Sequence, residues 1–192
     1  MSFPAIFFDR DNTLNIDPGY LSDPKLVELF DGVGEGIAKL KNEYGFKIVV
    51  ISNQSGIARG FFSNVEVDSV NKKVNQILLE KNNVIIDAFY YCPFHPDFSS
   101  NEESKCRKPS PLMVFQAANE MDLDLSKSYF VGDKPSDIEC GINAGIKTVL
   151  INYKKEKILP FKENRPSFII DNFLNACDFI ITDFTGGKTF VK

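Results

Sequence analysis

Apolar and polar positions alternate along the chain in blocks whose period changes from one block to the next. Phe3 to Phe8 is a short, continuously apolar run, which is typical of a strand buried on both faces. Residues 46–51 are mostly β-branched and end at Ser52, so they predict a second buried strand. Further strands are expected at residues 84–91, 128–131 and 147–151, with an edge strand at 168–170.

Helical periodicity fills most of the intervals between these strands. Ile37, Leu40 and Tyr44 recur at helical spacing before a glycine that ends the helix. Ser63 and Glu66 have the spacing of a capping box and begin a long helix. The expected helices span residues 34–44, 63–82, 111–121, 135–144 and 172–179. Strands that alternate with helices predict an α/β fold, a Rossmann-like doubly wound, mostly parallel sheet with helices on both faces.

Composition narrows the classes of function. The 192 residues are 43% hydrophobic, enough for one well-buried core, and the net charge of −4 argues against a nucleic-acid partner. No apolar run approaches the roughly 20 residues that span a bilayer, and the N-terminus lacks the pattern of a signal peptide. We therefore expect a soluble, cytoplasmic protein that binds no membrane. In that reducing compartment its four cysteines are expected as free thiols or metal ligands rather than disulfides.

Polar side chains follow three of the predicted strands. Asp9 follows the first strand directly, Ser52 follows the second, and Asp133 comes two residues after the fourth. Because the carboxyl ends of parallel strands meet at one edge of a sheet, we expect these groups to converge on one crevice. Asp11 lies only two residues from Asp9, so the two carboxylates either point to different sides or have a positive charge between them.

These residues supply the groups that phosphoryl transfer requires. An aspartate such as Asp9 can attack a phosphate when a cation offsets their repulsion, and the hard oxygens of Asp9 and Asp133 suit Mg²⁺. Ser52 and Lys108 could hold the remaining phosphoryl oxygens. A second carboxylate, Asp11, could move the proton of the leaving group.

The order and spacing of these residues resemble a known superfamily. Asp9-x-Asp11-x-Thr13-Leu14, Ser52, Lys108 and Gly132-Asp133-x-x-x-Asp137 resemble the four motifs of the haloacid dehalogenase superfamily of phosphohydrolases. Within it, residues 8–15, 17–20, 52–60, 92–96, 106–109 and 131–134 resemble the D-glycero-D-manno-heptose 1,7-bisphosphate phosphatase family. The histidinol-phosphate phosphatases are its near relatives. The resemblance covers residues 3–151.

The resemblance implies a role for each matching residue. Asp9 would be the nucleophile that forms an aspartyl-phosphate, and Asp11 would protonate the leaving oxygen and then activate water. Mg²⁺ would be held by the Asp9 side chain, the Asp11 backbone carbonyl and Asp133. The residues that would contact substrate or phosphate are Asp17, Pro18, Gly19, Tyr20, Ser52, Asn53, Gln54, Ser55, Arg107, Lys108 and Lys134.

The sequence departs from the family in the irregular segment 92–109. The family often holds a structural zinc there with four ligands, but Phe94 and Ser104 occupy two of these positions. Since structural zinc requires four ligands, we expect no zinc, and we interpret Cys92, Cys106 and the neighbouring His95 as a weak remnant of the site.

Two further positions bear on the site. Asn12 replaces the family's glycine in the first motif, and asparagine tolerates the left-handed backbone of such a turn. Asp137 is either part of the site or the cap of the following helix, and both readings stay open.

The spacing of the motifs leaves no room for a cap domain. A loop, a helix and a strand account for most of the chain between Asp11 and Ser52. We therefore expect residues 1–192 to form one phosphatase domain, a monomer whose partner is a small phosphorylated metabolite. A heptose bisphosphate is the leading substrate and histidinol phosphate the alternative. A receiver-like signalling domain that keeps its phosphate is the alternative of another class, although Asp11 favours turnover.

Overall fold

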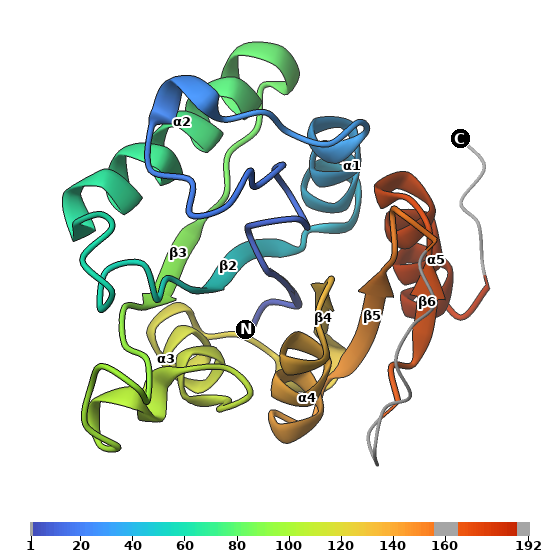
Figure 1. The fold of residues 1–192 in the computed structure, drawn as a ribbon. Coiled ribbons are helices and arrows are strands. Elements are labelled where there is room, and N and C mark those ends of the chain that lie inside the picture. The colour runs from blue at the N-terminus through green and yellow to red at the C-terminus, as the bar shows by residue number, and fades with distance from the viewer. Residues whose placement is uncertain (1, 156–164, 188–192) are drawn as a thin grey trace.

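The structure is a computed structural model that describes residues 2–155 and 165–187. The described residues contain one six-stranded, wholly parallel sheet in the order β3-β2-β1-β4-β5-β6 (Figure 1). Its strands are β1 (Ala5–Phe8), β2 (Lys47–Asn53), β3 (Ala88–Cys92), β4 (Tyr129–Gly132), β5 (Lys147–Ile151) and β6 (Phe168–Ile170).

Helices cover both faces of this sheet (Figure 1). They are α1 (Val33–Tyr44), α2 (Asn64–Asn82), α3 (Leu112–Met121), α4 (Pro135–Asn143) and α5 (Phe173–Phe184). Ile6 and Phe8 of β1 share a core with residues of α1, α2 and α5, whereas Ala5 and Phe7 pack with α3 and α4. This alternation confirms the predicted doubly wound fold, and the described part of the chain shows no separate cap domain.

Strand order places a crevice between β1 and β4. The chain runs outward from β1 to β2 and β3, and then crosses back to β4 on the other side of β1. The register continues past the end of β1, where the Asp9 N–H donates to the Val131 carbonyl at 2.9 Å. Ligands of open α/β sheets bind at this kind of switch point, outside the carboxyl ends of the strands.

Two element boundaries differ by more than two residues from those predicted. The strand expected from residue 84 begins at Ala88, because the Ile86 N–H and carbonyl pair with the side chain of Asn75 instead of a neighbouring strand. The last helix continues to Phe184, since its buried apolar stripe extends through Ile181.

Two local predictions, the capping box and the left-handed backbone of Asn12, are confirmed. The Ser63 N–H donates to the Glu66 carboxylate at 2.8 Å, as the capping box requires. Asn12 has the expected left-handed backbone, with φ of +65°. No helix among residues 2–155 and 165–187 has the length and apolar character needed to cross a bilayer.

Candidate active site

Three carboxylates gather at the carboxyl ends of β1 and β4. Oxygens of Asp9, Asp133 and Asp137 all lie within 4.8 Å of one another. Burial, and next the charge of Asp9, raises the pKa of Asp133 to about 7. The Thr13 hydroxyl donates to Asp133 at 3.3 Å, which joins the first and last motifs. The segments predicted to converge therefore do so.

This cluster fits the predicted magnesium ion. Carboxylate oxygens are the hard ligands that Mg²⁺ prefers, and a divalent cation would offset the repulsion of three nearby negative charges. The prediction named Asp9, Asp133 and the Asp11 backbone carbonyl as ligands. The structure adds the carboxylate of Asp137 to the group.

Asp137 serves both of the readings that the sequence left open. Its Oδ2 accepts the Lys134 N–H at 3.0 Å, which caps the start of α4. Its Oδ1 lies 2.7 Å from the Lys108 ammonium. Asp137 is therefore a helix cap whose other oxygen belongs to the charged cluster.

Lys108 is the buried cation of this cluster. Its Nζ lies 2.7 Å from Asp9 Oδ1 and donates to the Ile51 carbonyl at 2.7 Å, although the residue is only 3% exposed. Burial alone would lower the pKa of Lys108, but the charges of Asp137 and Asp9 outweigh it and raise the pKa. The ammonium therefore stays charged where a phosphoryl group would meet Asp9.

Side chains from the end of β2 hold this arrangement in place. The Asn53 amide exchanges hydrogen bonds with the backbone N–H and carbonyl of Lys108, at 3.0 and 3.2 Å. Asn53 was predicted to bind substrate, but its amide is engaged with the loop that carries Lys108. Gln54 Nε2 donates to Ser52 Oγ at 2.7 Å and to Asp11 Oδ2 at 2.8 Å.

The second aspartate of the first motif is surrounded by donors. The Asp11 carboxylate accepts from Arg10 at 2.9 and 3.0 Å, from Asn15 at 3.2 Å, and from Gln54. Burial alone would raise the pKa of Asp11, but the Arg10 charge and these hydrogen bonds lower it. Asp9 contacts Lys108 and Asp11 contacts Arg10, so separate cations hold the two neighbouring carboxylates.

A cleft of about 270 Å³ lies in front of these groups. The predicted residues that line it are Asp9, Asp11, Asp17, Gly19, Tyr20, Ser52, Asn53, Gln54, Ser55, Arg107, Lys108 and Lys134. Gly56, Phe62, Ser136 and Asp137 complete the lining. Of the other residues predicted to bind substrate or metal, Asp133 lines a second pocket with Asn12 and Tyr153, and Pro18 lines neither pocket.

The loop at residues 17–20 forms one rim of the cleft. Asp17 Oδ1 accepts the N–H groups of Gly19 and Leu21, both at 3.0 Å, so this carboxylate closes its own turn. The turn gives Tyr20 a φ of +58° and places its ring 4.7 Å from that of Phe61. Tyr20 is 46% exposed and lines the cleft.

Arg107 lines another part of the cleft, and Arg59 contacts the neighbouring loop. Arg59 lies over the Phe98 ring at 4.7 Å, and its Nη2 is 3.3 Å from His95 Nε2. Arg107 Nη1 donates to the carbonyl of Phe94, the neighbour of His95, at 3.5 Å, and burial, and next the charge of Arg59, lowers the pKa of Arg107. Neither arginine has an acidic partner in the part of the chain that the structure describes. Arg59 and Arg107 are thus two positive charges without an ion-pair partner among the described residues.

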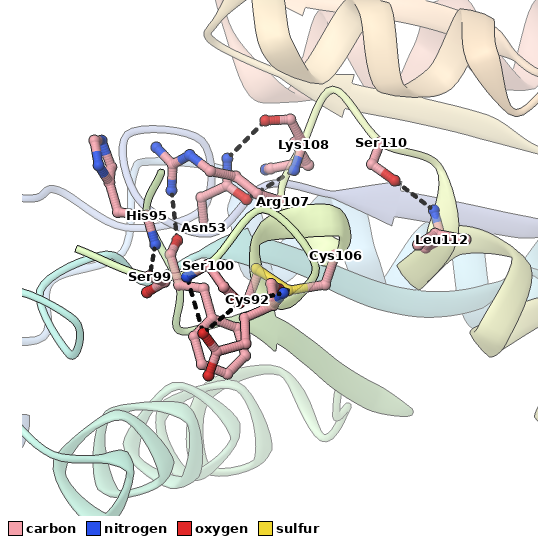
Figure 2. The surroundings of a disulfide bond; sticks show 12 residues. Asn53, Cys92, His95, Ser99, Ser100, Cys106, Arg107, Lys108, Ser110 and Leu112 are labelled. Carbon is pink, nitrogen blue, oxygen red and sulfur yellow. Dashed lines mark hydrogen bonds between the residues drawn. A yellow bond between two sulfur atoms is a disulfide. The ribbon is translucent and has the colours of Figure 1, made fainter. Parts of the chain in front are cut away.

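The expectation of free thiols is wrong for two cysteines. Cys92 at the end of β3 and Cys106 form a disulfide, while Cys140 and Cys177 are free and buried. Because the loop folds back on β3, the two sulfurs meet although 14 residues separate them in sequence. Figure 2 shows the bond beside Arg107 and Lys108, so it holds the loop that carries both side chains.

The disulfide also affects the three residues interpreted as a zinc remnant, Cys92, His95 and Cys106. The sulfurs of Cys92 and Cys106 bind each other, whereas His95 uses its ring nitrogens toward Arg59 and the Asp97 N–H. The three residues therefore form no common ligand set here.

Besides Gly56, Phe62 and Ser136 of the cleft lining, sequence reasoning missed three polar residues beside the cleft. Arg10 and Asn15 lie inside the first motif at positions that the motif leaves open, so their burial was not visible. Arg59 lies in the matching segment 52–60 but carried no separate signal. The nearest clue to it was its charge, within a segment that otherwise carries none.

Comparisons with known proteins agree with this geometry. The sequence profile described as HAD-hydrolase-like matches residues 105–176. A D-glycero-beta-D-manno-heptose-1,7-bisphosphate 7-phosphatase of Yersinia pestis is 42% identical over 78% of this chain and 80% of its own length. That of Escherichia coli K12 is 37% identical over 89% of this chain and 90% of its own.

A solved structure gives the same result. The D,D-heptose 1,7-bisphosphate phosphatase of B. bronchiseptica, complexed with magnesium and phosphate, matches with a TM-score of 0.79 and 26% identity over 94% of this chain and 99% of that one. The sequence identity and coverage of the two curated relatives extend well beyond the motifs. The chain therefore belongs to the heptose-1,7-bisphosphate 7-phosphatase family of the HAD-like phosphatases.

Proposed function

We propose that this protein removes the 7-phosphate of D-glycero-D-manno-heptose 1,7-bisphosphate through an aspartyl-phosphate on Asp9. The names of its relatives support the substrate. One observation supports the reaction above the others: the Asp9 carboxylate lies against the buried Lys108 ammonium at a cleft that Asp11 also lines.

The reaction would proceed in two displacements. An Asp9 oxygen attacks phosphorus, the bond from phosphorus to the sugar oxygen breaks, and Asp11 gives that oxygen a proton. A water oxygen then attacks the phosphorus while Asp11 takes a proton from it, and the bond to Asp9 breaks to release inorganic phosphate. Lys108 and the Ser52 hydroxyl would stabilise the charge of the phosphoryl oxygens in both displacements.

Asp9, Asp133 and the Asp11 carbonyl would hold Mg²⁺, with Asp137 in the same cluster. When bound, Mg²⁺ supplies positive charge that offsets the repulsion between the nucleophile and the phosphoryl group. The relative from B. bronchiseptica, which carries magnesium and phosphate, supports this assignment.

Arg59 and Arg107 favour a bisphosphate over histidinol phosphate. Arg107 lines the cleft and Arg59 contacts His95 beside it, and neither guanidinium has an acidic partner among the described residues. A second phosphate would satisfy them, whereas the cationic amine of histidinol phosphate would be repelled. Arg59→Gln should therefore raise the KM for the bisphosphate about tenfold and leave kcat within about twofold.

The test is steady phosphate release from both anomers of heptose 1,7-bisphosphate, with histidinol phosphate as the competing substrate. Phosphorus NMR of the product should show loss of the 7-phosphate, and Asp9→Asn should abolish release. Stoichiometric labelling of Asp9 without turnover would instead identify a receiver-like domain. Faster turnover of histidinol phosphate would reject the heptose assignment but keep the mechanism.

The cytoplasmic location and the monomeric state are also proposals. Fractionation of cells tests the first, and sedimentation of the purified protein tests the second.

A further inference from the structure

We propose that Arg10, held from behind by Asn71 of α2, is the positioning residue that fixes the acid/base Asp11 for the first displacement. This inference rests on the proposed function, because it assigns Asp11 the transfer of a proton to the leaving oxygen.

Arg10 is a fully buried cation whose side chain makes three oriented hydrogen bonds. Among the described residues that are less than 2% exposed, Arg10 has the largest side chain, and it is itself 1% exposed. Its Nε and Nη2 form a two-pronged pair with the two oxygens of Asp11, at 2.9 and 3.0 Å. Its Nη1 donates to Asn71 Oδ1 at 2.9 Å, which ties the guanidinium to the middle of α2.

A purely structural role explains this arrangement poorly. Burying an ion pair removes two charges from water, and replacing such pairs by apolar residues is often neutral or stabilising. Arginine cannot lose its charge to escape that cost, and its planar fork holds a carboxylate in one orientation. The geometry is what a catalytic carboxylate needs, because a proton must move along a defined direction.

The four hydrogen bonds of Asp11 divide into a fixed side and a cleft side. Oδ1 accepts from Arg10 and Asn15, and Oδ2 accepts from Arg10 and Gln54. Neither Arg10 nor Asn15 lines the cleft, whereas Gln54 does. The leaving oxygen therefore reaches Asp11 on the Gln54 side, where one uncharged hydrogen bond is exchanged while Arg10 keeps the carboxylate in place.

The test compares two leaving groups. p-Nitrophenolate departs without a proton, whereas a sugar alkoxide requires one, so only the sugar phosphate should depend on a well-placed Asp11. The measured quantity is kcat/KM, which ends at the first displacement and is unaffected by the hydrolysis of the aspartyl-phosphate common to both substrates. Asp11→Asn provides the reference pattern, a large loss for heptose 1,7-bisphosphate and a small one for p-nitrophenyl phosphate.

Asn71→Leu leaves Arg10 in place but removes its anchor. We expect kcat/KM to fall at least about tenfold for the heptose bisphosphate and less than about twofold for p-nitrophenyl phosphate. Arg10→Met should give the same pattern with a larger loss, and Arg10→Lys should recover part of it. If Arg10→Met does not fold, Asn71→Leu and Arg10→Lys decide the question.

The matched control is Asn75→Leu, one turn further along α2. Asn75 pairs with the Ile86 backbone, so its loss should lower the melting temperature. It should leave kcat/KM unchanged for both the heptose bisphosphate and p-nitrophenyl phosphate. If Asn71→Leu and Arg10→Lys lose kcat/KM equally for both substrates while Asp11→Asn shows the reference pattern, the role proposed for Arg10 is overturned. The proposed function would then still stand. A wild-type protein that hydrolyses neither substrate would overturn the proposed function as well.

Discussion

The two ends of the parallel sheet differ in the ratio of carboxylates to lysines. At the amino end of β4 and β5, the Asp183 carboxylate accepts hydrogen bonds from the Tyr129 hydroxyl and from the Lys147 ammonium, the latter at 2.6 Å. One carboxylate meets one cation there, and the lysine side chain is 55% exposed to water.

At the carboxyl end of the sheet the charges are unequal. Asp9 and Asp137 share one buried lysine, Lys108, while Asp133 lies 4.0 Å from the exposed ammonium of Lys134. Both Lys108 and Asp137 are almost wholly enclosed. A balanced, hydrated pair is what folding alone accounts for. An excess of buried negative charge costs free energy, so it indicates a positively charged ligand and hence a function.

The largest expected effect comes from removing the buried cation. Lys108→Met should abolish measurable turnover and lower the free energy of unfolding by about 3–5 kcal/mol, because two buried carboxylates lose their partner. Lys147→Met, at the balanced end, should cost about 1 kcal/mol or less and leave kcat unchanged. Urea unfolding and phosphate release measure both quantities. Similar losses of stability in the two variants would remove the contrast between the two ends.

Mg²⁺ should stabilise the protein by binding at the carboxyl end of the sheet, where Asp9, Asp133 and Asp137 gather. A ligand at a hundred times its dissociation constant stabilises the folded state by about 2.7 kcal/mol, so saturating Mg²⁺ should raise the melting temperature by about 5–10 °C. Asp133→Asn should abolish most of that rise, and Asp183→Asn should preserve it. An equal rise in all three proteins would place the ion elsewhere.

The disulfide should matter more for substrate binding than for chemistry. Cys106→Ser releases the loop that carries Arg107, while the Asn53 amide still holds the backbone of Lys108. We expect a loss of about 3 kcal/mol in the free energy of unfolding, as for a closed loop of similar length, and a higher KM at nearly unchanged kcat.

Reduction of the wild-type protein should reproduce this change and have no effect on Cys106→Ser. Thiol titration of the unfolded, unreduced protein should find two thiols, from Cys140 and Cys177. Four thiols would contradict the disulfide.

The difference between regular strands and irregular loops explains what could be predicted from the sequence. Asp9 and Asp133 follow buried strands and Ser52 lies at the end of one. Apolar periodicity locates strand ends well, so their convergence was predictable. The pairing of Cys92 with Cys106 depends on the path of an aperiodic loop, and no local pattern encodes that path.

Asn71 was also missed, although the sequence held a trace of it. It lies within the buried stripe formed by Val67, Val70 and Val74, where an amide needs a partner. That partner is Arg10, 61 positions away, and long-range side-chain pairs follow from packing rather than from periodicity.

The smallest expected effect concerns the balanced end and its response to acid. Burial would raise the pKa of Asp183, but hydrogen bonds from Lys147 and Tyr129 outweigh it and lower the pKa. A lowered pKa in the folded state contributes stability above the unfolded pKa of about 3.9, and this stability is lost as pH falls through the folded value.

Asp183→Asn should therefore be less stable than wild type at pH 7 by about 1 kcal/mol, and this difference should shrink as the pH falls below about 4. Urea unfolding of both proteins between pH 7 and pH 2.5 measures it. Asp178→Asn is the control on the same helix, because Asp178 and its partner Lys39 are well exposed and contribute little. A difference between Asp183→Asn and wild type that stays constant down to pH 2.5 would show that the carboxylate acts through shape rather than charge. The balanced end would then differ from the catalytic end in kind as well as in degree.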